Sequence, residues 1–538
     1  MQKNSMELTS RRKGELWLCA LAIGFGCFVM LLWWYTRMSL WEDEIIAITH
    51  VNQPLPLFFI ETLRNDIHPP LYFLQLKLWH DIGLTSDAAV LFNSVVCALF
   101  SLATLFVIAR KVYDEKTAYY AAALFALFPI FAYSGGNLRM YGLVPGCVLL
   151  LWYANRTWFV TGKRTWLVWA VVFEVLTSYL HAIEFFFVGF IALAACVESL
   201  YHARQDSASR NTKIDPRLRG WILTQVVVLI LISPLMASGM VRGSEAGAPG
   251  SLFDLLTEPG ALIAGWAPAS VLSLRLAGFT IFVFLAAAAM LERRSRVRTL
   301  IAVIATLFVA IAVSMLAKPM IKVPVFAANL LPFLALGAAA GIATHTSRYW
   351  RAGAFACMTA LAVAAVPLMH FQMTSDAYGE TGRLVKELAK PGDIVVVPNL
   401  SVYWGVMRYA VGENWGKPLE ILPLQPNEQW SKIFNKLGPE ATTTLGLRPL
   451  SDHVISSEVT YGIGEDARQL TANAQRVWVV QRNNFKVDVQ LGARFVRESI
   501  TRPKSTGVPG PDSLAVSFFT RNESGETVAR HPLNFTTP

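Results

Sequence analysis

Charged residues are scarce in this sequence. Only 16% of the 538 residues are Asp, Glu, Lys or Arg, whereas 54% are hydrophobic. A soluble globular chain usually has about a quarter of its residues charged. The sequence also lacks a Walker loop and a dinucleotide-binding glycine fingerprint, which disfavours a nucleotide-driven pump. These shortages exclude a cytosolic enzyme, a disordered protein and a collagen-like protein.

Cysteine is equally rare, and residues 371–538 contain none. That part of the chain therefore cannot depend on disulfides, and no zinc-binding spacing is present. All six cysteines fall inside apolar runs, where we expect them to be packing residues. They are Cys19, Cys27, Cys97, Cys147, Cys196 and Cys357.

Hydrophobic residues divide the chain into two parts. Residues 1–370 are a series of apolar runs, whereas residues 371–538 have the composition of a soluble protein. The first part has 29 Lys and Arg against 20 Asp and Glu, which gives +9 of the total charge of +10. Because the basic excess belongs to the membrane part, nucleic acid is not an expected partner.

Eleven apolar runs are long enough, or nearly so, to cross a bilayer, which requires about 20 residues for a helix. The sequence therefore predicts a polytopic α-helical membrane domain with about 11 spans, followed by an exported α/β domain. A 39-residue helix over 165–203 would overshoot a bilayer, so we expect a tight re-entry near His181. The predicted spans are 16–36, 88–110, 117–134, 141–160, 165–181, 183–203, 221–239, 271–291, 299–316, 325–344 and 353–370.

Lysine and arginine set the predicted orientation. Alternate loops, beginning with the N-terminal segment, hold 20 of these cations, and the opposite loops hold only seven. By the positive-inside rule the N-terminus is cytoplasmic, and an odd number of spans puts residues 371–538 outside. We expect a multi-pass protein of a bacterial inner membrane, in contact with membrane lipids, with a long first outer loop over 37–87.

The remaining polar residues gather on the predicted outer side, where burying them without a purpose is costly. Asp43 and Glu44 follow the first span and point to different faces of a helix or turn. One could face a cavity while the other contacts backbone or metal. The alternative is a solvated acidic cap at a helix start.

A second motif in the same loop is Asp66-Ile67-His68-Pro69-Pro70. In an extended segment Asp66 and His68 share a face, so His68 is a candidate ligand for phosphate, metal or hydroxyl. The alternative is a turn that only starts an interfacial helix through Trp79.

Cations and polar residues also lie near the predicted outer ends of later spans. Arg139, in Asn-Leu-Arg-Met-Tyr, suits a lipid phosphate, although it could also extend to lipid headgroups. Glu174, Ser178 and His181 share one face of the fifth span, where Glu174 is more simply a structural residue. Lys318 and Lys322 could add positive charge around an anionic substrate.

These motifs, in this order, resemble the C-type glycosyltransferases, integral membrane enzymes of the protein-mannosyltransferase and aminoarabinose-transferase kind. The resemblance covers roughly residues 16–370. It implies a polyprenyl-phosphate-sugar donor and an acceptor hydroxyl that the sequence does not identify. Asp43 matches the catalytic base with Glu44 beside it. Four substrate-binding positions are also matched: His68, Arg139, Tyr141 and His181.

Two positions depart from the family pattern. Many relatives have Glu where this chain has Asn137, and many have Arg before Asn-Leu where this chain has Ala328. The missing cation puts phosphate binding there in doubt unless Lys318 or Lys322 replaces it.

The resemblance implies inverting transfer, with one carboxylate as base and a cation on the departing phosphate. A divalent ion, Mg²⁺ or Mn²⁺, is an open alternative, with Glu44, Asp66 and His68 as its candidate ligands. A secondary transporter, a lipid flippase and an inactive relative that acts in assembly remain alternative functions. A transporter should show polar residues through the middle of the membrane.

Residues 371–538 alternate helical and strand patterns. We expect helices over 381–389 and 401–411 and strands over 394–397, 477–480 and 514–519. No set of residues there predicts a chemistry.

Overall fold

The computed structural model describes most of the first 370 residues and the ordered elements that follow. The described residues are 2–37, 39–65, 68–206, 216–241, 259–265, 272–293, 296–304, 323–345, 347–373, 378–397, 400–412, 453–456, 459–463, 471, 473–482, 495–501 and 514–521.

The chain divides into two compact units. The first contains Met1–Thr36 and Pro56–His370, and the second contains Arg37–Leu55 and Phe371–Pro538. Part of the segment expected as the first outer loop therefore packs with the second unit.

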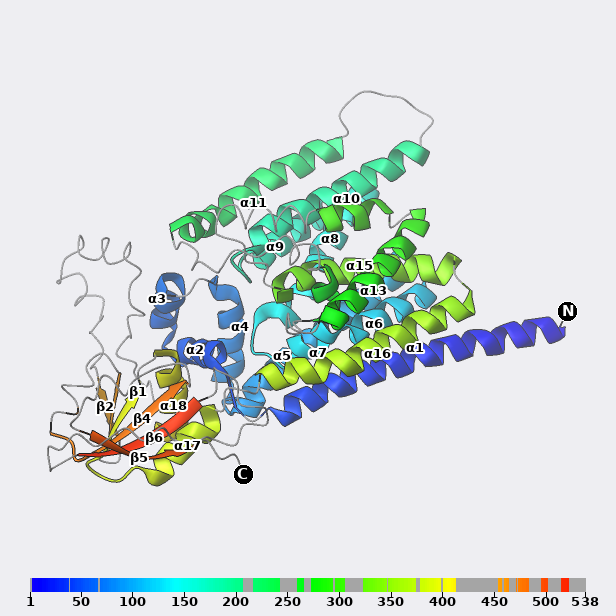
Figure 1. Ribbon diagram of the computed structural model, residues 1–538. Coiled ribbons are helices and arrows are strands. Elements are labelled where there is room, and N and C mark those ends of the chain that lie inside the picture. The colour runs from blue at the N-terminus through cyan, green and yellow to red at the C-terminus, as the bar shows by residue number, and fades with distance from the viewer. Residues whose placement is uncertain are drawn as a thin grey trace. The chain divides into compact units, whose positions relative to one another are not determined.

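The first unit is a bundle of helices, in which α9, α10 and α11 lie together on one side (Figure 1). Its elements are α1 (Gln2–Thr36), α3 (Leu55–Asn65, which begins one residue before the unit), α4 (Pro70–Asp81), α5 (Asp87–Val112), α6 (Glu115–Leu127), α7 (Pro129–Gly135), η1 (Met140–Gly142), α8 (Val144–Thr161), α9 (Arg164–Ser178), α10 (Glu184–Asp206), α11 (Pro216–Val241), α13 (Leu272–Leu291), α15 (Val323–His345) and α16 (Arg348–Met373).

Seven described helices are long and apolar enough to cross a membrane, or eight if the bent pair α6 and α7 counts as one span. The pair bends by 72° at the break before Pro129, which cannot donate a backbone hydrogen bond. Eleven spans were predicted. Of the others, α8 carries Asn155 and Arg156, α9 has only 15 residues, and 299–316 lies mostly outside the described residues. A multi-pass membrane protein follows from these helices.

Helix α15 is the centre of the first unit. The apolar stretch of α15 is buried throughout, whereas α1 and α11 leave most of their apolar residues exposed. A side chain at Gly341 would overlap the carbonyl of Ala288 in α13, so glycine permits this close approach. The exposed apolar faces of α1 and α11 are suited to lipid.

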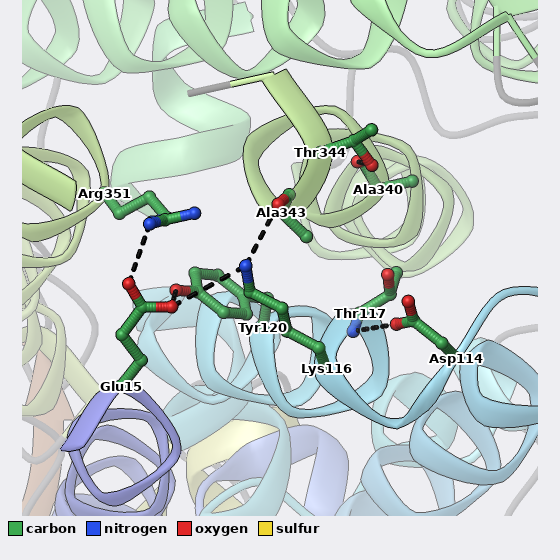
Figure 2. A network of polar contacts seen from close by, with 9 residues as sticks. All are labelled: Glu15, Asp114, Lys116, Thr117, Tyr120, Ala340, Ala343, Thr344 and Arg351. Carbon is green, nitrogen blue, oxygen red and sulfur yellow. Dashed lines mark hydrogen bonds and ion pairs between the residues drawn. The ribbon is translucent and has the colours of Figure 1, made fainter. Parts of the chain in front are cut away.

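Glu15 joins three helices at one end of the bundle (Figure 2). Its carboxylate lies 2.7 Å from the Arg351 guanidinium of α16, and it accepts a 3.3 Å hydrogen bond from Tyr120 of α6. The ammonium of Lys116 is 3.6 Å away and also donates to the Ala343 carbonyl of α15 at 3.1 Å. One carboxylate on α1 thus holds cations from two other helices.

A second polar cluster surrounds Arg298, which was expected as a loop cation but is only 1% exposed. Its guanidinium donates to the Tyr113 hydroxyl at 2.7 Å and lies 3.5 Å from the Glu198 carboxylate. It also stacks 4.7 Å from the ring centre of Trp152, whose indole donates to Glu198 at 3.1 Å. Burial raises the pKa of Tyr113 above its usual value, so the phenol stays protonated.

The second unit contains α2 (Glu42–Val51) and a six-stranded mixed sheet with order β2-β3-β1-β4-β6-β5, against which α17 and α18 pack (Figure 1). Strand β1 pairs in parallel with β3 and β4, and the other pairs are antiparallel. The elements are α17 (Tyr378–Leu388), β1 (Ile394–Val397), α18 (Leu400–Val411), β2 (His453–Ser456), β3 (Val459–Ile463), β4 (Arg476–Arg482), β5 (Phe495–Thr501) and β6 (Leu514–Arg521).

Replacing the Glu15 carboxylate tests the contact in Figure 2. Glu15→Gln keeps the size of the side chain but removes its attraction for Arg351 and Lys116. Because these groups are partly exposed, we expect the melting temperature to fall by only about 2 °C. Glu115→Gln, at an exposed carboxylate on α6, is the control, and equal melting temperatures for the two variants would contradict the role of Glu15.

Candidate functional site

The break between α9 and α10 presents His181 inside the first unit. Helix α9 ends at Ser178 and α10 begins at Glu184, so the re-entry predicted from the length of the apolar run is present. The His181 side chain is 2% exposed, and its Nδ1 accepts a 3.2 Å hydrogen bond from the backbone N–H of Ile183. That bond leaves Nε2 to carry the proton of the neutral ring.

His68 lies against His181. Pro69 and Pro70 start α4, because proline is compatible with the first turn of a helix. The backbone N–H of Leu71 donates to the Tyr179 carbonyl at 3.3 Å, which ties this start to the end of α9. The two imidazole centres are then 4.6 Å apart, and His68 is 7% exposed. Residues 113 positions apart in the chain thus share one place in the fold.

The Asn-Leu-Arg-Met-Tyr motif contributes a third residue, Tyr141, to the group formed by His68 and His181. Arg139 caps the short helix η1 and is 6% exposed, and its backbone N–H donates to the Asn137 carbonyl at 2.7 Å. Two residues later the Tyr141 ring lies 6.3 Å from His181, centre to centre, and stacks 6.2 Å from Tyr133. His68, Tyr141 and His181 therefore meet, with Arg139 next along the chain.

Glu174 has a structural environment, as the sequence favoured. One of its carboxylate oxygens accepts hydrogen bonds from Asn155 at 2.8 Å and Gln225 at 3.2 Å, and the other accepts from Gln225 at 3.1 Å. The Asn155 carbonyl oxygen in turn accepts from the Trp221 indole at 2.8 Å. This network connects α8, α9 and α11 across the bundle.

Sequence reasoning missed a polar pair beside His181. Glu184 begins α10, and its carboxylate accepts a 2.8 Å hydrogen bond from the amide of Asn329 in α15. Both side chains are buried. A carboxylate three residues after a candidate histidine was a visible signal, but nothing in the sequence pairs it with a residue 145 positions later.

Asp43 and Glu44 lie in the second unit, in the first turn of α2. Glu44 is fully buried, forms an ion pair with Arg37, and accepts a 3.0 Å hydrogen bond from the backbone N–H of Trp41. Asp43 is half-buried. The two adjacent carboxylates therefore differ: Glu44 is committed to an arginine and to the helix start.

Three predicted site residues, Asp66, Lys318 and Lys322, lie outside the described residues. Within the part of the chain that the structure describes, no three His, Cys, Asp or Glu side chains are grouped as metal ligands. Of the expected metal ligands, Glu44 is already paired with Arg37. The described donors do not fit a divalent ion, and no reaction step is assigned to one.

The chain is similar to known proteins both in part of its sequence and in its fold. Residues 67–208, which include His68, Arg139, Tyr141 and His181, match the family model of dolichyl-phosphate-mannose-protein mannosyltransferase. The structure of ArnT from Cupriavidus metallidurans in the apo state has a TM-score of 0.57 and 12% identity, over 93% of this chain and 97% of ArnT. The fold is that of ArnT.

The structure of the same ArnT bound to undecaprenyl phosphate is equally similar, with a TM-score of 0.57 and 13% identity, over 93% of this chain and 98% of that chain. No curated protein sequence matches this chain. The resemblance predicted from the ordered motifs is confirmed.

Glu44 and Asp43, the two adjacent acids of α2, should differ in how much their substitution destabilises the protein. Glu44→Gln leaves Arg37 without its charged partner, which we expect to destabilise the second unit by about 3 kcal/mol. Asp43→Asn should change stability by less than about 1 kcal/mol, because that side chain is half-exposed. Denaturant unfolding of the full chain, followed by tryptophan fluorescence, measures both, and a larger loss for Asp43→Asn would contradict the assignment.

Proposed function

We propose that this protein transfers a sugar from a polyprenyl-phosphate-sugar donor to an acceptor hydroxyl, with inversion at the anomeric carbon. The observation that carries the proposal is the meeting of His68, Tyr141 and His181, inside the segment that matches the mannosyltransferase family model. The similarity in fold to ArnT, which has been crystallised with undecaprenyl phosphate, supports a lipid-linked donor.

The anionic head of such a donor needs a cation. Arg139 is a guanidinium at the N-terminus of η1, and its planar fork can bond two phosphate oxygens at once. His68, Tyr141 and His181 supply neighbouring donors and aromatic faces for the head of the donor. Lys318 and Lys322 remain candidates for added positive charge. As the phosphate departs with both electrons of the anomeric C–O bond, a fixed cation stabilises the charge that develops.

Asp43 is the proposed base. It takes the proton of the acceptor hydroxyl as that oxygen forms its bond to the anomeric carbon, through an oxocarbenium-like transition state. Glu44 is unsuitable because its carboxylate is paired with Arg37 and bonded to the start of α2. A single carboxylate acting by direct displacement gives inversion. The sugar is a hexose or pentose, and the acceptor is a hydroxyl of a cell-envelope glycan, lipid or protein.

The polar residues inside the first unit favour an enzyme over a transporter. A transport path would need polar groups that face an opening through the middle of the membrane. Glu174, a buried acid of α9, instead has both carboxylate oxygens bonded to Asn155 and Gln225. An inactive relative is the remaining alternative, because of the departures at Asn137 and Ala328.

Loss of the Asp43 carboxylate should abolish transfer. We expect Asp43→Asn to lower the rate at least 100-fold, since a general base contributes about 10²- to 10⁴-fold. The measurement is release of radiolabelled sugar from polyprenyl-phosphate sugars by the purified full chain. Asp81→Asn, at an acid that closes α4, is the control, and undiminished transfer by Asp43→Asn would remove Asp43 as the base.

The proposed location is a bacterial inner membrane, with the second unit on the extracytoplasmic side. Because residues 371–538 contain no cysteine, an introduced one can report its side. Lys386→Cys, at an exposed position of α17, should react with a membrane-impermeant maleimide in intact cells or spheroplasts. Lys163→Cys, exposed between α8 and α9, should react only after permeabilisation, and the reverse pattern would invert the proposed topology.

A further inference from the structure

Glu184 and Asn329 form a polar pair deep inside the first unit. They are 0% and 3% exposed and come from α10 and α15. The Asn329 amide nitrogen donates to Glu184 Oε1 at 2.8 Å and to the Val325 carbonyl at 3.1 Å, so both of its protons are used. This fixes the orientation of the amide, because a flipped Asn329 would set its oxygen against two acceptors.

The pair ends in two oxygens that lack a donor. Glu184 Oε2 and Asn329 Oδ1 are buried, and neither has a hydrogen-bond partner among the described residues. A buried polar group without a partner costs about 1 to 3 kcal/mol, so native structures rarely leave two together. Glu174, an equally buried acid of the same bundle, has both oxygens bonded to protein. The pair therefore provides acceptors for a group that the described residues do not supply.

The pair also borders the site already described. The backbone N–H of Glu184 donates to the His181 carbonyl at 3.0 Å. On the other helix, Ala327 and Ala328 directly precede Asn329 and line a small cavity together with Ser134, Tyr141 and Gly142. Tyr141 is the ring that lies beside His181. Asn329 thus directly follows two residues that line this cavity, and Glu184 lies three residues after His181.

We propose that Glu184 and Asn329 form a subsite for a hydroxyl or amino group of the donor sugar. The inference rests on the proposed function and names the part of the donor that this pair recognises. A carboxyl oxygen and an amide oxygen accept hydrogen bonds from O–H and N–H groups, and neither offers the positive charge that binds phosphate. Ala328, directly before Asn329, adds no cation that would draw phosphate to this place.

The test compares two ligands. One is the polyprenyl-phosphate sugar that the wild-type full chain transfers best from a panel of hexoses and pentoses, and the other is sugar-free undecaprenyl phosphate. Glu184→Gln keeps the shape of the side chain but replaces one acceptor oxygen by a donor. We expect it to weaken binding of the sugar-bearing lipid about tenfold or more, and to leave binding of undecaprenyl phosphate unchanged.

Two further variants keep the result interpretable. Glu174→Gln, at the acid whose oxygens the protein already bonds, should leave the ratio of the two affinities unchanged. Asn329→Ala removes the second acceptor and should lower the same ratio, which tests the subsite even if Glu184→Gln fails to fold. Analogues of the sugar that each lack one hydroxyl or amino group identify the group that the pair binds. The analogue that lacks this group should bind the wild type weakly, and Glu184→Gln should not weaken its binding further.

Three outcomes overturn the subsite. If Glu184→Gln weakens the binding of both lipids equally, the pair only supports the packing of the bundle. A lower melting temperature with unchanged affinities would lead to the same conclusion. A gain in the affinity of Glu184→Gln for undecaprenyl phosphate, with no loss for the sugar-bearing lipid, would mean that the pair only disfavours phosphate. Failure of the proposed function is a different result, in which the wild-type chain transfers no sugar from any donor in the panel.

Discussion

An apolar helix bundle can contain a polar side chain only where another group satisfies it, and this constraint governs the first unit. Water is absent from the hydrocarbon core, so each charge or amide must find its partner in the protein. Arg298 contacts Tyr113, Glu198 and the face of Trp152. Glu174 accepts hydrogen bonds from Asn155 and Gln225. Each such pair crosses between helices, so satisfying the charge also fixes how the helices pack.

The exceptions to this constraint are informative for the same reason. Asn137 is fully buried, and neither atom of its side-chain amide has a hydrogen-bond partner among the described residues. It lies two residues before Arg139, at a position where many relatives have glutamate. With Glu184 and Asn329, it places unsatisfied polar atoms on chain segments that also carry Arg139, Tyr141 and His181. Buried polar atoms without a partner also occur elsewhere in the bundle, but these three residues are the ones whose segments carry the candidate site.

Sequence alone predicted much of the first unit because membrane helices have a strong signature. Seven predicted spans correspond to α1, α5, α10, α11, α13, α15 and α16. The break at His181 followed from the length of the run. The motif order predicted that Asp43, His68, Arg139 and His181 share one site; His68 and His181 do lie side by side, and the site as a whole stays a prediction. The partners were not predictable. Glu15 and Arg351 are 336 positions apart, and Glu184 and Asn329 are 145 apart. Periodicity identifies a helix face, but it does not identify what that face meets.

The charges beside the site also determine how a donor can lie in it. A polyprenyl-phosphate sugar has an anionic phosphate and a sugar rich in hydrogen-bond donors. In the proposed function Arg139, at the N-terminus of η1, binds the first, and Glu184, at the start of α10, binds the second. Ala327 and Ala328 of α15 line a small cavity beside Tyr141, and neither side chain adds a cation there. In that proposal a cation on one segment and hydrogen-bonding oxygens on the other orient the donor, with its phosphate toward Arg139 and its sugar toward α10 and α15.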